Sequence, residues 1–266
     1  MTALPEYEVI ALKYASRAGR RPDHFIGGDP HDVEMPMDYY VWVIRGGGRL
    51  VLVDTGFNMD MALKRKRTLL RTPAAGLKLL GIQPSEVRTV VITHFHNDHV
   101  GTFDGFPNAE FHVQDDEMVF ATGRHMRYER FNRAYEPDHI VGLVRLVYAN
   151  RVAFHRGDET LAPGISVHRI GGHTAGMQVV RVHTARGWVV LASDASHYYE
   201  HFEQERAFPL VYHVGELIEG YRRLKSLAGS ARHIIPGHDP LVIERYPALS
   251  DELRGIAARL DVDPTS

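Results

Sequence analysis

Residues 89–93 (TVVIT) run directly into His94-Phe95-His96-Asn97-Asp98-His99, and this stretch decides how the whole chain is interpreted. The first five residues are β-branched, which is typical of a buried strand. The next six hold four potential metal ligands, whereas six residues at the average histidine frequency of this chain would hold about 0.4 histidines. A loop at the end of a strand is held rigidly while its side chains still converge on a cavity. The stretch therefore predicts a metal site at a strand end.

The spacing within this motif indicates a second metal ion. In an extended loop, His94 and His96 project to the same side and can share one metal. The adjacent Asp98 and His99 point elsewhere, where they can serve another. A chance cluster of surface histidines is disfavoured by the density of the motif.

Three later positions repeat one pattern, in which a short apolar run is followed by a turn and a single potential ligand. His173 follows 165–170, Asp194 follows 188–192, and His238 follows 233–235. Taken singly, each would be read as a structural histidine or a turn aspartate. Together they complete two sites, with Asp194 as a bridging carboxylate. The predicted ligands are His94, His96 and His173 for one metal, and Asp98, His99 and His238 for the other.

Composition excludes several classes of protein. The chain has 266 residues, 44% hydrophobic and 24% charged, as in a globular protein with one sizeable core or two small ones. It has no cysteine, so nitrogen and oxygen must supply any metal ligands. Such a donor set suits two divalent ions, zinc as the first expectation and iron, manganese or cobalt as alternatives. Lys and Arg number 31 against 33 Asp and Glu, a net charge of −2 that disfavours nucleic acid and anionic membrane as partners.

The sequence also predicts where the protein resides. No apolar run approaches the roughly 18 residues that a membrane span needs. Glu6, Glu8 and Lys13 occupy the region where a signal peptide would be apolar. We therefore expect a cytoplasmic protein that does not associate with membranes.

Strand signals recur along the whole chain. Residues 39–45 and 49–53 flank three consecutive glycines, which predicts a hairpin. An apolar repeat at three- and four-residue spacing over 213–228 predicts a helix. No internal repeat or linker divides the chain, so we expect a single domain, 1–266, of mixed strands and helices. Further strands are predicted at 89–93, 110–113, 165–170, 178–182, 188–192 and 233–235.

The segment 118–156 has weak strand signal and is rich in aromatic residues and arginine. Two interpretations stay open. It forms a helical cover over the active site, or a pair of amphipathic helices packed on the core with one face in solvent. As a cover, its residues Met126, Phe131, Tyr135 and Ile140 would suit an apolar acyl chain or an aromatic ring.

These residues resemble the signature of the metallo-β-lactamase superfamily. The resemblance rests on the motif at 94–99 together with Gly172-His173-Thr174, Asp194 and Gly237-His238-Asp239, and it extends from residue 53 to residue 239. It implies an α/β fold, the αβ/βα sandwich, in which two mixed β-sheets pack face to face with helices outside and the metals at one edge. It also implies that Asp54 orients the ligand histidines instead of serving only as a turn residue.

Within the superfamily, the sequence is most similar to N-acyl homoserine lactonases and related lactonases. The similarity lies in the size, in residues 81–101, in Asp194-Ala195-Ser196 and in residues 236–239. That family usually has a tyrosine three residues after the bridging aspartate, where it contacts the substrate. Here His197 stands at that position, followed by Tyr198, so one of the two takes the role or the substrate differs. A homodimer is a further implication of this resemblance.

The resemblance implies a hydrolase that acts on ester bonds of a small molecule. A hydroxide shared by the two metals would open a lactone ring, with N-acyl homoserine lactone as one candidate and quorum quenching as its biological role. Asp98 would pass a proton to the leaving oxygen, and His197 or Tyr198 would hydrogen-bond the substrate.

Other functions compete with this one. A thioesterase resembling glyoxalase II has the same metal motif, and Arg222, Arg223, Lys225 and Arg232 could hold its anionic thiol carrier. A hydrolase of another small ester or cyclic substrate is a further alternative. A nuclease is disfavoured by the net charge. A non-catalytic metal sensor is disfavoured because an intact set of seven ligands has no obvious use without an open coordination position.

Overall fold

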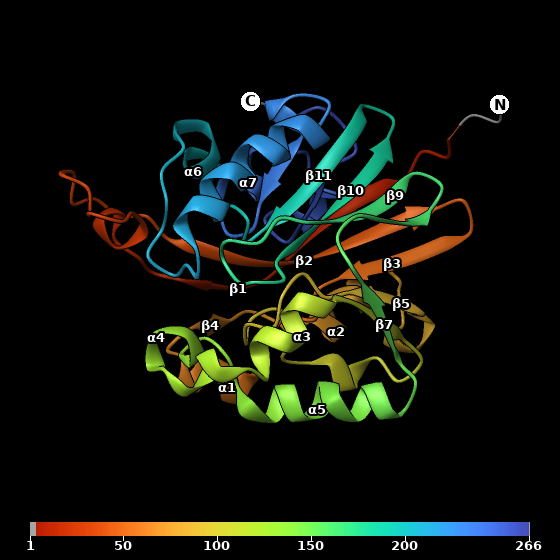
Figure 1. The fold of residues 1–266 in the computed structure, drawn as a ribbon. Helices are drawn as coiled ribbons and strands as arrows, with labels where there is room; N and C mark the ends of the chain where they lie inside the picture. The colour runs from red at the N-terminus through yellow and green to blue at the C-terminus, as the bar shows by residue number, and fades with distance from the viewer. Residues whose placement is uncertain (1–3, 266) are drawn as a thin grey trace.

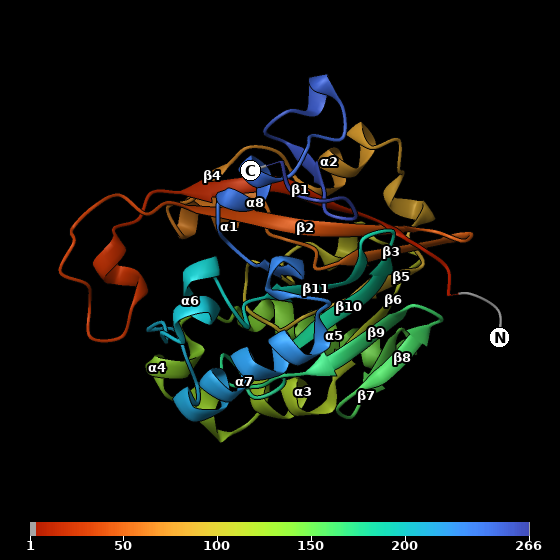
Figure 2. The same ribbon diagram turned by 90° about the horizontal axis from the view of Figure 1, so that it is seen from above.

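A computed structural model describes residues 4–265, in which two β-sheets pack face to face between helices (Figures 1 and 2). The first sheet has the strand order β13-β1-β2-β3-β5-β6-β7, with β4 paired to β1. Its pairs are antiparallel from β13 to β3 and parallel from β3 to β7. The strands are β1 (Glu8–Arg17), β2 (Met37–Gly46), β3 (Arg49–Val53), β4 (Thr68–Leu69), β5 (Thr89–Val91), β6 (Glu110–Gln114), β7 (Val152–His155) and β13 (Ala257–Arg259).

The second sheet has the order β12-β11-β10-β9-β8. Its β11 and β12 pair in parallel, and the other neighbours are antiparallel. Both sheets are therefore mixed, which confirms the predicted fold class. The strands are β8 (Glu159–Ala162), β9 (Ile165–Arg169), β10 (Gln178–Thr184), β11 (Gly187–Ser193) and β12 (Ile234–Pro236).

The glycine run forms the predicted hairpin between β2 and β3. Gly46 pairs with Arg49, so Gly47 and Gly48 form the turn. Their φ angles are +55° and +73°, a region that glycine enters without steric penalty.

Alternation along β2 builds the two apolar layers. Tyr40, Trp42 and Ile44 belong to an apolar cluster that also contains residues of the second sheet, among them Val180 and Leu191. The intervening residues Tyr39, Val41 and Val43 belong to the cluster on the outer face of the first sheet. A strand that is buried on both faces reads as a continuous apolar run, as this one does.

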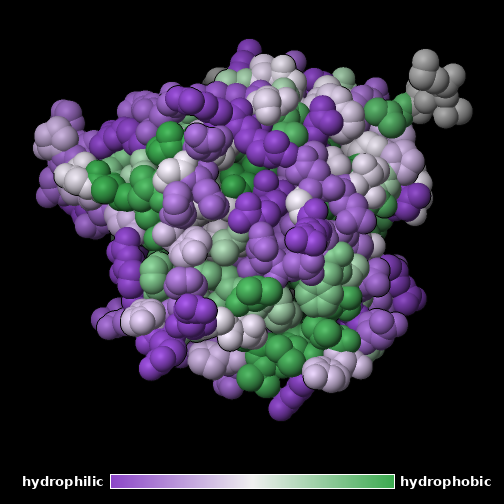
Figure 3. All heavy atoms as spheres, in the orientation of Figure 1, coloured by the Kyte–Doolittle hydropathy of each residue, from purple (hydrophilic) through white to green (hydrophobic). Residues whose placement is uncertain are grey.

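Helices cover the outer faces of the sandwich. Helix α7 (Val214–Leu227) lies on the second sheet, and α2 (Pro73–Leu79) and α5 (Pro137–Tyr148) lie on the first (Figure 1). No helix of residues 4–265 is long and apolar enough to cross a membrane. Figure 3 shows a largely hydrophilic face with apolar side chains gathered in the region of α5. The shorter helices are α1 (Met59–Lys64), α3 (Asp115–Ala121), α4 (Glu129–Asn132), α6 (Tyr199–Gln204) and α8 (Leu241–Arg245).

Some predicted elements differ from the observed ones. Strand β5 ends at Val91, two residues before the predicted end, because Thr93 leaves the ladder with β6. Its amide donates to the Asp54 carboxylate, and its carbonyl accepts from the Gln178 amide. The segment 118–156 holds α4 and α5 and also β7, which its weak strand signal did not predict. Strands β1, β4, β8 and β13 had no counterpart among the predicted strands.

The sheet topology collects the predicted ligands at one end of the sandwich. Strands β3 and β5 run parallel in the first sheet, and β11 and β12 run parallel in the second. Strand β9 points the same way as β11, since both are antiparallel to β10. The loops that follow these strands carry Asp54, the motif at 94–99, His173, Asp194 and His238. A site at the carboxyl ends of such strands is a common outcome in α/β proteins.

Candidate metal centre

The first donor group contains His94, His96, His173 and Asp194, all of them buried. Nδ1 of His96 lies 3.0 Å from Nε2 of His94 and 2.9 Å from Nε2 of His173. The last two nitrogens are 3.2 Å apart. Oδ2 of Asp194 lies 3.3 Å from Nε2 of His173. Four donor atoms therefore face one small volume.

The second donor group contains Asp98, His99 and His238, also buried. Nε2 of His99 lies 3.9 Å from Oδ1 of Asp98. Oδ1 of Asp194 lies 3.3 Å from Nε2 of His99 and 3.0 Å from Nε2 of His238. The two oxygens of Asp194 thus face different groups, as a bridging carboxylate requires.

The ring nitrogens on the outer side of the histidines are already occupied. Nδ1 of His173 donates to the carbonyl of Leu210 at 2.7 Å, and Nδ1 of His238 donates to the carbonyl of Asp38 at 2.8 Å. Nδ1 of His99 donates to the carboxylate of Asp54 at 2.7 Å. In the neutral form each of these imidazoles carries its one proton on Nδ1, so the inward-facing Nε2 would present a lone pair to a metal ion.

This chemistry fits metal ions. Burial lowers the pKa of His94, His96 and His173, so these imidazoles are neutral and able to coordinate. Nε2 of His99 and Oδ1 of Asp194 are buried without a hydrogen-bond partner. Burial alone would lower the pKa of His99 too, but Asp194, Asp54 and Asp98 raise it overall. Uncompensated lone pairs and negative charge in a buried site are what cations would satisfy.

Asp54 contacts the candidate ligand His99 on the side of the ring that faces away from the other donor atoms. It is fully buried with a φ of +63°, a conformation that non-glycine residues adopt mainly where the surrounding structure holds them. Its carboxylate accepts from the amide and the hydroxyl of Thr93 at 2.7 and 2.8 Å, and from His99. Asp54 therefore fixes the orientation of His99 relative to strand β5, the role that the resemblance implied.

Glu117 is a supporting residue that the sequence did not indicate. It lies on α3, is 1% exposed, and one carboxylate oxygen accepts from the Phe95 amide at 2.9 Å. The other oxygen accepts from the Gly176 amide at 3.0 Å and the Thr174 hydroxyl at 2.6 Å. Glu117 thus ties the loop of His94 and His96 to the loop of His173. A single acidic residue early in a helix has no sequence signal that could have revealed this.

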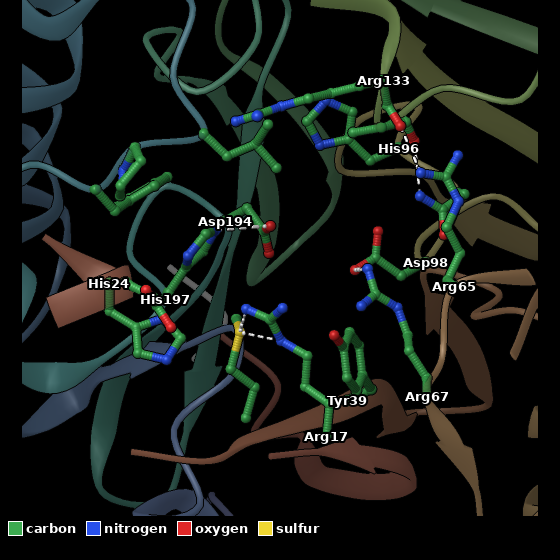
Figure 4. A pocket seen from close by; sticks show the side chains of 17 residues that line it. Arg17, His24, Tyr39, Arg65, Arg67, His96, Asp98, Arg133, Asp194 and His197 are labelled. Carbon is green, nitrogen blue, oxygen red and sulfur yellow. Dashed lines mark hydrogen bonds and ion pairs between the residues drawn. The ribbon is translucent and has the colours of Figure 1, made fainter. Parts of the chain in front are cut away.

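A cavity of about 320 Å³ lies beside the two donor groups (Figure 4). This volume is near the lower end for small-molecule sites. Asp98, Asp194 and His96 line it, as do Tyr39 and the segment 208–210. Burial alone would raise the pKa of Asp98, but His99 and Arg67 hold it below its usual range.

His197 and Tyr198 point to different places. His197 lines the cavity, stacks on Phe208 with ring centroids 3.8 Å apart, and places Nε2 3.0 Å from Oδ2 of Asp194. It also forms a third potential donor group with Asp194 and His238, which the sequence interpretation did not include. Burial lowers the pKa of His197 to about 3. The hydroxyl of Tyr198 instead donates to the carbonyl of Pro36 at 3.1 Å, outside the cavity lining.

The segment 118–156 contributes to the cavity at its rim. Arg133 and Ala134 line the cavity. Met126, Tyr135 and Ile140 line an adjacent hollow of about 500 Å³, which also contacts Arg133. Phe131 packs on Phe120 and Tyr212.

The basic residues considered for a thiol carrier lie elsewhere. Arg222 and Lys225 pair with Glu205 at 3.8 and 3.6 Å, and Arg223 pairs with Asp158. These residues and Arg232 are absent from the described lining of the cavity. These basic residues are therefore not placed to hold an anionic thiol carrier at the cavity.

Comparison with known proteins gives a consistent result. The family model described as the metallo-beta-lactamase superfamily matches residues 36–242. A probable metallo-hydrolase of Mycobacterium tuberculosis is 27% identical over 220 residues, which cover 76% of this chain and 71% of the relative. N-acyl homoserine lactonase AttM of Azorhizobium caulinodans is 29% identical over 178 residues, which cover 62% of this chain and 63% of the relative.

Solved structures share the fold. A quorum-quenching N-acyl homoserine lactone lactonase matches with a TM-score of 0.74 and 21% identity, over 90% of this chain and 94% of that one. The dizinc quorum-quenching lactonase AidC, in complex with a product, matches with a TM-score of 0.68 and 16% identity, over 89% of each chain. At such identities the likeness shows the fold alone.

Proposed function

The chain belongs to the metallo-beta-lactamase superfamily, and from this premise we propose that it is a dinuclear metal-dependent hydrolase that opens the ring of a small lactone. The observation that carries the proposal is the convergence of two buried donor groups on opposite oxygens of Asp194, beside a cavity of about 320 Å³. The similarity to several curated N-acyl homoserine lactonases supports a lactone as the substrate.

The donor set assigns the metal ligands. His94, His96 and His173 would hold one ion, and Asp98, His99 and His238 the other, with Asp194 between them. Zinc is the first expectation, since histidine and carboxylate ligands suit it. When bound, two such ions supply hydroxide at neutral pH and Lewis-acid stabilisation of the developing charge.

The reaction adds one water across the ester bond. The ring C–O bond breaks, and the product is a hydroxy acid that releases a proton at neutral pH. Asp98 lies at the cavity and would carry a proton to the ring oxygen as it leaves. The hydroxyl of Tyr14 donates to the Asp98 carbonyl at 2.8 Å and so holds this residue in place.

We assign the substrate contact to His197 and not to Tyr198. His197 is neutral, lines the cavity and already donates to Asp194. If a metal ion bound Asp194, the ring N–H of His197 would be free to donate to the substrate. Tyr198 instead stabilises the backbone beside the cavity, because its hydroxyl donates to the carbonyls of Met35 and Pro36.

A small molecule is the expected partner, and neither nucleic acid nor membrane is expected to bind. The homodimer implied by the lactonase relatives stays a prediction, which light scattering of the purified protein can test.

The test is acid release in a pH-stat with metal-loaded protein. The panel runs from short- and long-chain acyl homoserine lactones to simple γ-lactones, aromatic lactones, linear esters and thioesters. The proposal predicts turnover of at least one lactone, and loss of metal and turnover in a His173→Asn variant that stays folded. Two bound metals with turnover of thioesters alone would overturn the lactonase assignment and leave the metal site standing.

A further inference from the structure

Two arginines face the cavity from one side. Arg17 is the last residue of β1, and Arg67 directly precedes β4. The pairing of these strands joins Ala15 to Leu69 and Ser16 to Thr68, so the register continued by one residue places Arg17 opposite Arg67. Both line the cavity, and Figure 4 shows their guanidinium groups directed into it, near Asp98 and Asp194.

The two arginines differ in their charge partners. Arg67 has Asp98 at 4.0 Å and lies over the ring of Tyr39, with 4.8 Å from its guanidinium carbon to the ring centroid. Its Nε is buried without a hydrogen-bond partner. Arg17 donates from Nε and Nη2 to the sulfur of Met37 at 3.1 and 2.9 Å. A thioether is only a weak acceptor, and within residues 4–265 no carboxylate forms an ion pair with Arg17.

No anionic group at the cavity compensates the charge of Arg17. The other two cations of the lining, Arg65 and Arg133, only add positive charge; Arg65 is paired with Glu136, and Arg133 is exposed at the rim. Asp23 also lines the cavity, but it is exposed and forms no ion pair with either arginine among the described residues. Asp98 and Asp194 belong to the candidate metal centre.

Like charges placed directly opposite each other on paired strands are destabilising. The arrangement is explained if an anion binds between the two guanidinium groups. Arg17 has no carboxylate partner and Arg67 has only Asp98 at 4.0 Å, so a negative charge is the complement of the pair. A carboxylate has this charge, and its two oxygens match the planar fork of arginine.

We propose that Arg17 and Arg67 bind a carboxylate of the substrate, so that this enzyme acts on a small lactone that itself carries a carboxylate. This inference rests on the proposed lactonase function and narrows its substrate class. The cavity volume of about 320 Å³ suits such a compact molecule. Both guanidinium groups act in binding and orientation, while the reacting ester bond lies over the metal centre.

The kinetic test compares two lactones of similar size with metal-loaded protein. One is paraconate, a γ-butyrolactone with a ring carboxylate, and the other is neutral β-methyl-γ-butyrolactone. We expect wild type to favour paraconate in kcat/KM at least about tenfold. Arg17→Gln or Arg67→Gln should lower this preference about 10- to 100-fold. Arg17→Lys should lose less, since it keeps the charge without the planar fork.

The matched control is Arg222→Gln. Arg222 lies on α7 with its side chain 71% exposed, and it should leave the preference unchanged. Circular dichroism of each variant verifies that it is folded.

A binding measurement separates this inference from the proposed function. The probe is cyclopentanecarboxylate, which cannot be hydrolysed, titrated calorimetrically into wild type and each variant. We expect its Kd to rise at least about tenfold in Arg17→Gln. If lactones are hydrolysed but neither the preference nor this Kd depends on Arg17 or Arg67, the carboxylate site is overturned and the lactonase stands. If no lactone is hydrolysed but the Kd depends on Arg17, the lactonase fails and the carboxylate site stands.

Discussion

Replacing Glu117 by glutamine tests whether this residue ties the two ligand loops together. Each carboxylate oxygen of Glu117 accepts from one backbone amide, that of Phe95 on one side and that of Gly176 on the other. Glutamine offers only one oxygen, so in either orientation its NH₂ group must face a backbone N–H. The hydroxyls of Tyr135 and Thr174 can rotate to accept, but a backbone amide cannot.

The expected magnitude follows from this geometry. One buried N–H left without an acceptor costs about 1–3 kcal/mol. We therefore expect Glu117→Gln to lower the free energy of unfolding by about 2 kcal/mol. Because one of the two ligand loops is released from this tie, metal affinity should also fall about 10- to 100-fold.

Two assays measure these effects. Urea denaturation of metal-free protein gives the free energy of unfolding without the contribution of bound metal. Competition with a chromophoric chelator gives the metal affinity. Glu219→Gln is the matched control, because Glu219 is an exposed residue of α7. Wild-type values of both quantities in Glu117→Gln would show that Glu117 does not tie the two ligand loops together.

Four further predictions follow from the same site. Removing metal with a chelator should abolish lactone turnover in the pH-stat, and adding zinc or manganese should restore it, whereas turnover that survives chelation would contradict a metal role. Asp98→Asn should reduce kcat at least about 100-fold, and a wild-type rate at full metal content would exclude its proton transfer. His197→Ala should lower kcat/KM for lactones. Tyr198→Phe should leave kcat/KM within about twofold of wild type and lower the free energy of unfolding by about 1 kcal/mol. If instead Tyr198→Phe lowered kcat/KM and His197→Ala did not, the substrate contact would belong to Tyr198. Asp54→Asn should weaken zinc binding about 10- to 100-fold in chelator competition, and unchanged affinity would remove its orienting role.

The clustering of the candidate metal ligands could be predicted from sequence because each signal is local. A β-branched run followed by a turn and one ligand fixes where a strand ends, and parallel strands bring such ends to one edge. Residues 94–99, His173, Asp194 and His238 all follow this pattern, and the structure places their donor atoms within two groups. The hairpin at Gly47 and Gly48 was predictable for the same reason.

The features that sequence could not supply depend on long-range contacts. Arg17 meets Arg67 only because β1 pairs with β4, fifty residues later in the chain. Glu117 is recognisable only by the backbone amides that it meets in the folded protein. The choice between His197 and Tyr198 depends on which adjacent side chain faces the cavity, and the strand-end pattern carries no information on this point.

Anomalous diffraction from zinc-loaded crystals would locate the bound metal ions directly. We expect two zinc peaks, one on either side of Asp194. One should lie about 2.0–2.1 Å from ring nitrogens of His94, His96 and His173, and the other at this distance from those of His99 and His238. A single peak, or peaks away from Asp194, would contradict the dinuclear centre on which the proposed hydrolysis depends.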